Sequence, residues 1–425
     1  MLLRPIKLVQ IRTAVLSISL LVLAGGIGYW FGQHRVRVEL GDSRDKIRVE
    51  VVNKATPLER RSIDFSLFWQ VWEELERSYL DPDLIDPEKM VFGAIAGMTS
   101  SLGDPYTVFL APSENRQTKE NLSGSFYGVG IQIGYKDRQL AVIAPIKDMP
   151  AERAGLEAGD YILRIIDEGK GVDEETRGLA LPEAVSLIRG DRGTTVTLEI
   201  FREGVEEPFD VEITRAEIVI PSVELAFLPV EAQEGKSIAH LQLRQFGERT
   251  GEEWDQAVSQ ILSRRAELVG LVIDVRNNPG GFLSGAIKIA GEFVRDGTVV
   301  VQQGRHGSET FRVEKPGRLT DIPIVVLMNE GSASASEIVA GALRDRLGAV
   351  LVGEQTFGKG TVQEAKDLSG GAGLHVTTSR WILPSGKEIN DRGLTPDVEV
   401  SLVEEEEGED EVDEQLEKAI EILVE

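Results

Sequence analysis

The C-terminal half of the chain alternates uninterrupted apolar runs with helical patterns, and this alternation constrains the fold more than any other feature. The apolar runs lie at residues 268–273, 322–328 and 349–352, and the helical patterns lie at 285–294 and 336–347. Apolar runs without polar alternation are typical of strands that are covered on both faces, as in a parallel sheet between helices. We therefore expect an α/β core in this half of the chain.

The rest of the chain divides into segments with other periodicities. Short alternating strands, glycine-rich turns and one helical pattern near residues 182–188 predict a mostly β module. Upstream of it, aromatic and aliphatic residues spaced as on one face of a helix predict a helical segment. The expected order is a signal anchor at residues 1–32, a linker at 33–61, the helical segment at 62–120, the β module at 121–215, the α/β core at 216–402, and an acidic tail with a short helix at 403–425.

The N-terminal segment has the composition of a membrane-directed helix. Arg4, Lys7 and Arg12 precede an uncharged stretch at residues 13–31, which is about long enough to cross a bilayer core. We therefore expect one transmembrane or signal helix that ties the chain to a membrane. No clear small-residue cleavage pattern follows the stretch, which favours retention of the anchor, and a cleaved signal peptide is the alternative.

Composition excludes several classes of function. The formal net charge of −25 opposes binding to nucleic-acid backbones, and nine of the eleven residues from 404 to 414 are acidic. The chain has no cysteine, which excludes disulfides, thiolate catalysis and cysteine zinc sites. Its four histidines are scattered without metal-binding spacing. We expect no metal, no cofactor and no nucleic-acid partner.

Three segments of the core stand at strand ends, where α/β folds place their chemistry. Residues 274–281 form a glycine turn whose amides could stabilise an oxyanion, although such a turn is also common without any function. Residues 329–337 bring small residues and serines to the start of a helix. There Ser334 and Glu337 also match a capping box, which needs no catalytic role. Residues 353–363 contain a lysine between two glycines.

The third segment admits two interpretations. It nearly matches a phosphate-binding loop, but Gly360 stands where that loop needs a serine or threonine, and the next pattern is a strand instead of a helix. A serine–lysine pair is the favoured interpretation, because burial in an apolar pocket lowers the pKa of a lysine and lets it act as a base. Lys359 is placed to be held in this way.

The β module carries a Gly-Val-Gly-Ile tetrad at the start of a strand, followed by further glycine-containing segments at 150–156 and 159–163. These features resemble a PDZ domain. That resemblance implies that Gly128, Val129, Gly130 and Ile131 present backbone N–H groups to the terminal carboxylate of a peptide, while the adjacent strand pairs with the peptide.

From about Phe65 to the C-terminal helix, the chain resembles the carboxyl-terminal processing proteases, which are membrane-associated or exported serine peptidases with a Ser-Lys dyad and an inserted PDZ domain. The motifs that carry the resemblance are Gly-Asp-Pro-Tyr-Thr at 103–107, Arg-Asn-Asn-Pro-Gly-Gly at 276–281, the serine run at 331–338 and Phe-Gly-Lys-Gly-Thr at 357–361. The resemblance implies a crotonase-like α/β protease core, with Ser334 as nucleophile and Lys359 as general base.

The same resemblance assigns four supporting positions. Gln363 corresponds to a glutamine that supports the lysine, and Asp345 to an acidic position associated with activity. The backbone N–H groups of Gly280 and Ala335 correspond to the oxyanion hole. The resemblance also implies protein substrates with flexible, apolar C-terminal tails, cut on the extracytoplasmic side of a bacterial-type cytoplasmic membrane, periplasmic or extracellular.

Two matters stay open at this point. The competing hypothesis is a membrane-tethered PDZ scaffold whose core is inactive. The short helix after the acidic run is expected to pack on the core or to contribute to a homo-oligomer.

Overall fold

The computed structural model describes residues 36–39, 48–51, 64–401 and 413–425, and the chain divides into two compact units at residues 87 and 88. The predicted signal anchor at residues 1–32 lies outside the described residues. Within the described ranges, no helix is both long enough and apolar enough to cross a membrane.

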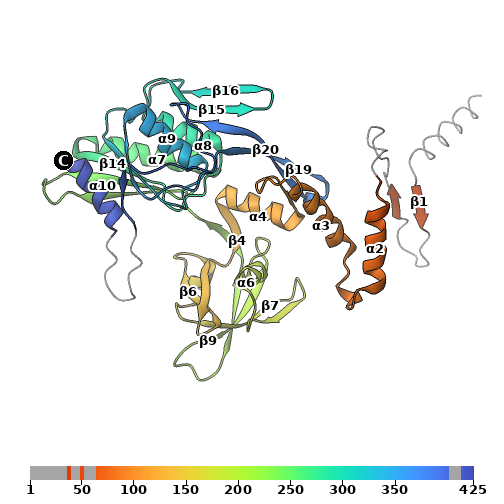
Figure 1. The fold of residues 1–425 in the computed structure, drawn as a ribbon. Coiled ribbons are helices and arrows are strands. Elements are labelled where there is room, and N and C mark those ends of the chain that lie inside the picture. Colours follow the sequence, from red (N-terminus) through yellow and green to blue (C-terminus); the bar gives the residue numbers. More distant parts are fainter. Residues whose placement is uncertain (1–35, 40–47, 52–63, 402–412) are drawn as a thin grey trace, which may run out of the picture. The chain divides into compact units, whose positions relative to one another are not determined.

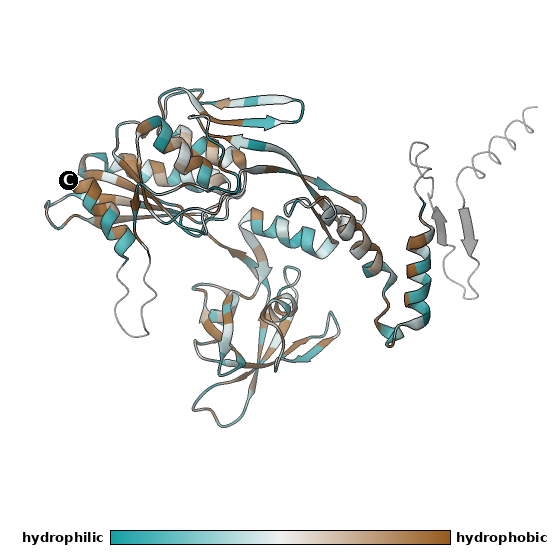
Figure 2. Cartoon of the chain, viewed as in Figure 1, coloured by the Kyte–Doolittle hydropathy of each residue, from teal (hydrophilic) through white to brown (hydrophobic). Residues whose placement is uncertain are grey.

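The first unit contains the strands β1 (Val36–Glu39) and β2 (Arg48–Val51), which pair antiparallel, and the helix α2 (Ser66–Ser78). Helix α2 confirms the predicted helical segment, and Figure 2 shows apolar and polar residues side by side along it. No residue of α2 is buried. Its aromatic rings contact one another instead, with 5.1 Å between the ring centroids of Phe68 and Trp69.

The second unit is built on a six-stranded sheet that confirms the expected α/β core. The strand order is β12-β13-β14-β17-β18-β21, and all neighbours are parallel except β12 and β13. The strands are β12 (Val223–Pro229), β13 (Ser237–Leu243), β14 (Leu268–Asp274), β17 (Ile324–Met328), β18 (Val350–Gly353) and β21 (Val398–Glu399).

Helices cover both faces of this sheet, as the uninterrupted apolar runs predict. Alternate strand residues such as Ile273 and Val326 pack with α7 (Thr250–Ser263), α8 (Leu283–Gly291) and α9 (Ala335–Leu347). The intervening residues, such as Val272 and Val325, pack on the opposite face with Ala419 of α10 (Glu414–Val424). The predicted C-terminal helix therefore packs on the core (Figure 1).

A second, antiparallel sheet extends from the core. Its order is β16-β15-β20-β19, and β3 also pairs with β20. These strands are β3 (Val108–Leu110), β15 (Thr298–Gly304), β16 (Gly307–Arg312), β19 (Thr361–Asp367) and β20 (Gly373–Ile382). Beside β3 lie the helices α3 (Pro87–Ser100) and α4 (Pro112–Ser123).

The β module forms a sheet of its own in the order β10-β9-β7-β6-β5, with β8 (Val172–Glu175) paired to β7. Its strands are β5 (Ile131–Lys136), β6 (Gln139–Pro145), β7 (Tyr161–Asp167), β9 (Thr195–Phe201) and β10 (Phe209–Thr214), and its helices are α5 (Pro150–Arg153) and α6 (Leu181–Ile188). The module has a separate apolar core. It joins the rest of the unit through an antiparallel ribbon of β4 (Ser125–Gly128) and β11 (Ala216–Val219).

Candidate active site

Ser334 lies at the tip of the loop between β17 and α9, immediately before the first helical residue. Its backbone has φ of 56° and ψ of −111°. Non-glycine residues rarely adopt such a strained conformation, and those that do cluster at functional sites. The neighbouring Ser332 and Ser336 are fully buried, and their hydroxyls donate to the carbonyl oxygens of Val275 at 2.7 Å and Asn278 at 2.8 Å. Ser334 alone of the three serines is partly exposed.

Lys359 lies in the loop between β18 and β19. Its side chain is partly buried, and Nζ lies 4.9 Å from the ring centroid of Tyr106. Burial lowers the pKa of the Lys359 ammonium, and the charge of Asp104 opposes that shift only in part. Burial therefore shifts the pKa of Lys359 downward, which is the direction that a general base requires.

The buried carboxylate of Glu337 joins the serine and lysine segments. Its Oε2 accepts hydrogen bonds from the backbone N–H of Ser334 at 2.8 Å and of Lys359 at 2.9 Å. Its Oε1 accepts from the backbone N–H of Gly358 at 2.8 Å and from Thr356 Oγ1 at 2.6 Å. Burial raises the pKa of Glu337, against the effect of these four donors.

Sequence reasoning assigned Glu337 only to a capping box and missed this second role. The capping-box spacing is the signal that pointed to the residue. The spacing could not show that backbone N–H groups of the lysine loop, more than twenty residues later, donate to the same carboxylate.

The glycine turn after β14 lies against Ser334. A Cβ atom added to Gly280 would lie 2.8 Å from the Cβ of Ser334 and 3.1 Å from the backbone nitrogen of Ala335, so only glycine fits there. The structure thus brings together the two residues expected to form the oxyanion hole. The N–H of Gly280 donates to Asn278 Oδ1 at 2.9 Å in this structure.

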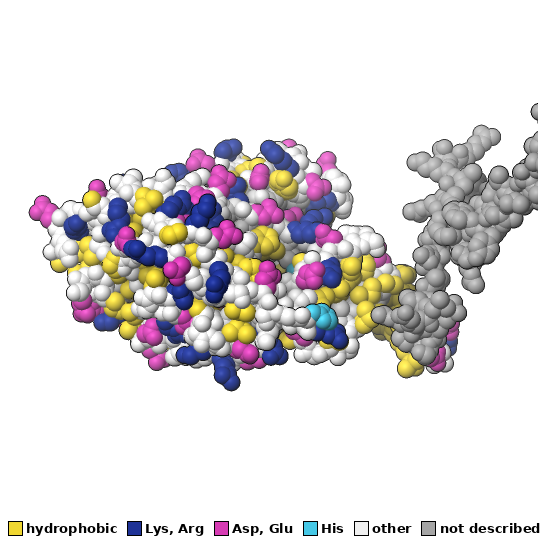
Figure 3. Space-filling view, turned by 90° about the horizontal axis from the view of Figure 1, so that it is seen from above, with side chains coloured by type: hydrophobic (Ala, Val, Ile, Leu, Met, Phe, Trp, Pro, Cys, Tyr) yellow, Lys and Arg dark blue, Asp and Glu magenta, His cyan; other side chains and the backbone are white. Residues whose placement is uncertain are grey.

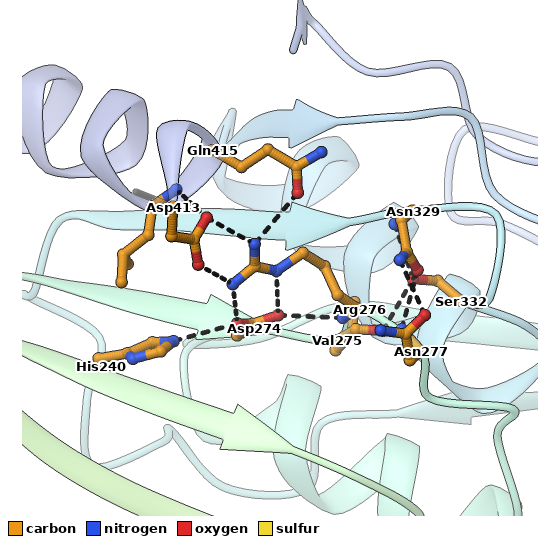
Figure 4. Close-up of polar contacts among 10 residues, drawn as sticks. His240, Asp274, Val275, Arg276, Asn277, Asn329, Ser332, Asp413 and Gln415 are labelled. Atoms are coloured by element: carbon orange, nitrogen blue, oxygen red, sulfur yellow. Dashed lines mark hydrogen bonds and ion pairs between the residues drawn. The ribbon is translucent and has the colours of Figure 1, made fainter. Parts of the chain in front are cut away.

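Polar side chains connect the loops after β14 and β17 (Figure 4). Asn329 Oδ1 accepts from the backbone N–H of Asn277 at 2.8 Å, and Asn329 Nδ2 donates to Asn277 Oδ1 at 2.9 Å. Asn277 has a φ of 55°. These bonds fix the start of the glycine turn relative to the serine loop.

Arg276 links the same turn to the C-terminal helix. Figure 4 shows its guanidinium between Asp274 on one side and Asp413 and Gln415 on the other. Its nitrogens lie 2.6 Å from Asp274 Oδ2 and 2.8 Å from Asp413 Oδ2. Asp274 is fully buried and also contacts His240 Nε2 at 3.1 Å. Because Asp413 is the N-cap of α10, the C-terminal helix supports the strand end that carries the turn.

The two remaining residues predicted to support catalysis, Gln363 and Asp345, make hydrogen bonds to partners other than Ser334 and Lys359. Gln363 Nε2 donates to Thr361 Oγ1 at 2.9 Å and to Thr377 Oγ1 at 3.2 Å, and no hydrogen bond joins it to Lys359. Asp345 lies on α9, about 16 Å along the helix from Ser334 at the usual rise per residue. Its Oδ2 accepts from the backbone N–H of Ser385, so it fixes a distant turn.

An open cleft of about 450 Å³ runs beside the proposed catalytic residues. Lys359, Gly280, Gly281 and His375 line it, together with residues of α4 and of the ribbon that leads into the β module. Strand β19 follows Lys359 directly, and no helix begins there to cradle a phosphate group. The nucleotide-binding alternative therefore lacks its structural basis.

The glycine tetrad of the β module lies between β4 and β5. Gly130 has φ of +78°, and an added Cβ would lie 2.4 Å from the Cβ of Met149, so glycine is required there. Strand β5 is the last strand of its sheet and pairs only with β6, while α6 packs against it. A peptide strand could therefore add to the free edge of β5.

Family models match three parts of the chain. They are described as Peptidase family S41 at residues 237–400, PDZ domain at residues 117–201 and Activating protease CtpB N-terminal domain at residues 21–113. The PDZ match coincides with most of the β module that the sequence placed at 121–215.

Curated relatives agree with these models. The chain is 36% identical to the carboxy-terminal processing protease CtpA of Bacillus subtilis, over 78% of this chain and 68% of that protein. It is 39% identical to a carboxy-terminal-processing protease of Bartonella bacilliformis, over 78% of this chain and 74% of that protein. Among solved structures, the photosystem II D1 C-terminal processing protease shares 30% identity over 79% of this chain and 92% of that chain, with a TM-score of 0.47. The chain therefore belongs to the carboxy-terminal processing proteases, which are serine-type peptidases of family S41 with a PDZ domain.

Proposed function

We propose that this protease captures the C-terminal tail of an unfolded or flexible protein with its PDZ domain and cleaves the protein near that tail through a Ser334–Lys359 dyad. The observation that carries the proposal is the shared carboxylate oxygen of Glu337. Because the backbone nitrogens of Ser334 and Lys359 both lie within 2.9 Å of it, they are less than about 6 Å apart. The backbones of the proposed nucleophile and of the proposed base, whose pKa is lowered, are thus held next to each other.

The acylation step follows from these positions. Neutral Lys359 takes the hydroxyl proton of Ser334 while Oγ attacks the scissile carbonyl carbon, which gives a tetrahedral oxyanion. The protonated lysine then gives that proton to the leaving amine, the C–N bond breaks, and the acyl group stays on Ser334. A water molecule then attacks the acyl carbon and gives a proton to Lys359. The bond to Oγ breaks, the lysine returns that proton to Ser334, and the new carboxylate is released.

We assign stabilisation of the oxyanion to the backbone N–H groups of Gly280 and Ala335. The N–H of Ala335 belongs to the first turn of α9, where backbone donors have no partner within the helix. In the reaction, the N–H of Gly280 would exchange its bond with Asn278 for one with the substrate oxyanion. Preorganised donors of this kind contribute about 3 kcal/mol each to lowering the barrier.

Substrate capture is assigned to the PDZ domain. The tail would lie along the free edge of β5, with its carboxylate at the amides of the segment from Gly128 to Ile131. Apolar tails suit this groove, because Val129 and neighbouring apolar side chains of α6 and β5 line the domain core beside it.

We also propose that residues 13–31 anchor the protease in a bacterial-type cytoplasmic membrane, with the catalytic part outside the cytoplasm. The support is the uncharged length of that stretch and its basic flank. Extraction of the full chain from membranes should need detergent, whereas a chain that starts at residue 33 should stay in the soluble fraction. Soluble behaviour of both forms would contradict the anchor.

Mass spectrometry of peptide products tests the proposed dyad. Ser334→Ala should abolish cleavage of a peptide with an apolar C-terminus, while the variant still binds that peptide. Ser332→Ala and Ser336→Ala are the matched controls and should keep measurable activity. Ser336→Ala loses one buried hydrogen bond, and Ser332→Ala loses both the bond it donates to Val275 and the bond it accepts from the N–H of Asn329, each worth about 1 kcal/mol of stability. If the wild-type protein binds tails and never cuts them, the inactive scaffold is the better description.

A further inference from the structure

His375 lies in the antiparallel sheet, two residues along β20 from Thr377, which pairs with Gln363. It belongs to β20 and stands opposite Ala365 of β19, while Thr377 stands opposite Gln363. Residues two apart in a strand share a face and are about 7 Å apart. His375 therefore continues a row of side chains that starts beside the loop of Lys359.

The imidazole of His375 is open to the cleft. His375 and Lys359 line the same cavity, together with Gly280 and Gly281. The ring is partly buried, yet no hydrogen bond or ion pair found among the described residues uses it, in contrast to His240, which is bound to Asp274. Opposite His375, Ala365 of β19 contributes only a methyl group, and Val108 of β3 flanks it on the other side.

The fixed charges around this cleft are largely balanced by opposite charges. Arg244 and Arg249 on its wall are neutralised by Glu224 and Glu253. Arg189 lies over the ring of Phe126, and the charge of Glu120 acts on its guanidinium. The carboxylate that lines the cleft is Glu120. On the face of the chain seen in Figure 3, positive and negative side chains are likewise interspersed.

Burial, together with the charge of Lys359, lowers the pKa of His375. Lys359 is the charged group that acts on the ring, since no other charge contributes to its shift. The free ring is therefore neutral near neutral pH. An acidic group beside it would favour protonation, because an opposite charge raises the pKa of an imidazole.

We propose that His375 is a specificity-determining residue, which as an imidazolium binds an acidic side chain of the substrate within a few residues of the scissile bond. This inference rests on the proposed function, because it places the substrate chain in the cleft beside Lys359 and Gly280. It adds a second element of recognition, at the cut site, to the capture of the tail by the PDZ domain.

Pairs of substrate peptides test this inference. The two peptides of a pair share an apolar tail and differ by one residue, glutamate or glutamine, placed in turn at each position that flanks the cut. The measured quantity is the ratio of kcat/KM for glutamate to that for glutamine. At each pH this ratio cancels the ionisation of Lys359, because both peptides meet the same dyad.

At one or more positions, the wild-type ratio should rise about three- to five-fold between about pH 8 and about pH 5.5, the gain expected of one partly exposed ion pair. His375→Gln should hold the ratio constant across this range, and His375→Lys should keep it high at every pH. His306→Gln, in the exposed turn between β15 and β16, is the matched control and should behave as wild type. Binding of the same peptides to Ser334→Ala should show the same dependence without catalysis.

The outcomes separate the two proposals. If neither peptide is cleaved, the proposed function itself fails. If both are cleaved but the ratio is independent of pH, or still rises with acid in His375→Gln, the role of His375 is wrong. A preference for glutamate that is equal at all pH values belongs to Arg189 and counts against His375.

Discussion

Two cations follow the strands on either side of β17, and their surroundings are opposite. Arg276, after β14, is held by the carboxylates of Asp274 and Asp413, and these partners raise its pKa despite its burial. Lys359, after β18, is partly buried, no carboxylate of the described residues forms an ion pair with it, and its pKa is lowered. The paired cation fixes the position of a loop, whereas the unpaired one is left able to release a proton. The difference teaches that charge partners, more than burial alone, separate structural from chemical cations here.

The largest effect on activity is expected when Lys359 is replaced by a residue with a permanent charge. Lys359→Arg should be as inactive as Lys359→Ala, a loss of about 10⁴-fold in kcat/KM, because arginine keeps its charge and cannot take the serine proton. Peptide binding to both variants should persist, which shows that they fold. Measurable activity of the arginine variant would contradict a lysine base.

The pH profile of the wild-type enzyme tests whether activity depends on the neutral form of Lys359. A lysine with a lowered pKa becomes neutral at a lower pH than usual, so kcat/KM should rise with pH and level off below the ordinary lysine pKa of about 10.4. EDTA should leave this profile unchanged. Strong inhibition by EDTA with rescue by a divalent metal would contradict the proposed mechanism.

Removing the paired cation should affect stability first. Arg276→Met leaves the fully buried Asp274 without its main partner, which should cost about 3–5 kcal/mol of the free energy of unfolding in urea denaturation. The matched control is Arg295→Met, because its partner Asp321 is exposed and such a pair contributes about 1 kcal/mol or less. Equal losses in the two variants would show that the buried pair has no special role.

The pH dependence of that loss can be derived from Asp274. Burial raises its pKa, but the hydrogen bonds from His240 and Arg276 outweigh burial, and the net shift is downward. A carboxyl with a depressed pKa stabilises the fold above its unfolded pKa, and this contribution disappears as the pH falls through the folded value. The difference between wild type and Arg276→Met should therefore be largest near neutral pH and shrink below about pH 4.

Glu337 tests whether the two loops must be held together for activity. Glu337→Gln keeps the shape but replaces one acceptor oxygen by an NH₂ group, which would face N–H donors. We expect kcat/KM to fall about 30-fold, mostly in kcat, since the substrate does not contact this side chain. Glu364→Gln, an exposed position on β19, should leave kcat/KM unchanged. A rise in KM with kcat unchanged would indicate that Glu337 shapes the substrate cleft instead.

Much of this architecture is readable from local patterns. The apolar run at residues 268–273 became β14, and the helical pattern at 336–347 became α9, because strand and helix periodicity are properties of neighbouring residues. The double use of Glu337 and the docking of Asp413 on Arg276 depend on contacts between segments far apart in the chain, and no local pattern carries them.

The hydrogen-bond partners of Asp345 and Gln363 could not be predicted from the sequence either. Asp345 was expected to be a catalytic position, yet it lies eleven positions after Ser334 along the helix, and it accepts a hydrogen bond from the turn at Ser385. Gln363 shares the strand that follows Lys359, but its amide is directed to threonine hydroxyls. Their catalytic roles stay predictions.

The smallest expected effect concerns the glycine tetrad of the PDZ domain. Amidation of a substrate's C-terminus removes the anion that the tetrad would bind and leaves every side chain unchanged. Capture should weaken, and kcat/KM for the amidated peptide should fall about ten-fold, while the chemical step at Ser334 does not depend on that end. Initial rates for the free and amidated forms of one peptide measure this ratio.

A variant of the tetrad supplies the control for the amidated peptide. Gly130→Leu places a side chain against Met149 at a positive φ, so it should disturb the carboxylate site locally and reduce kcat/KM for the free peptide to a similar extent. Amidation should then cost this variant nothing further, because both changes remove the same interaction. If free and amidated peptides are cut equally well by the wild type, the PDZ domain does not read C-termini, and recognition of internal sequence becomes the better hypothesis.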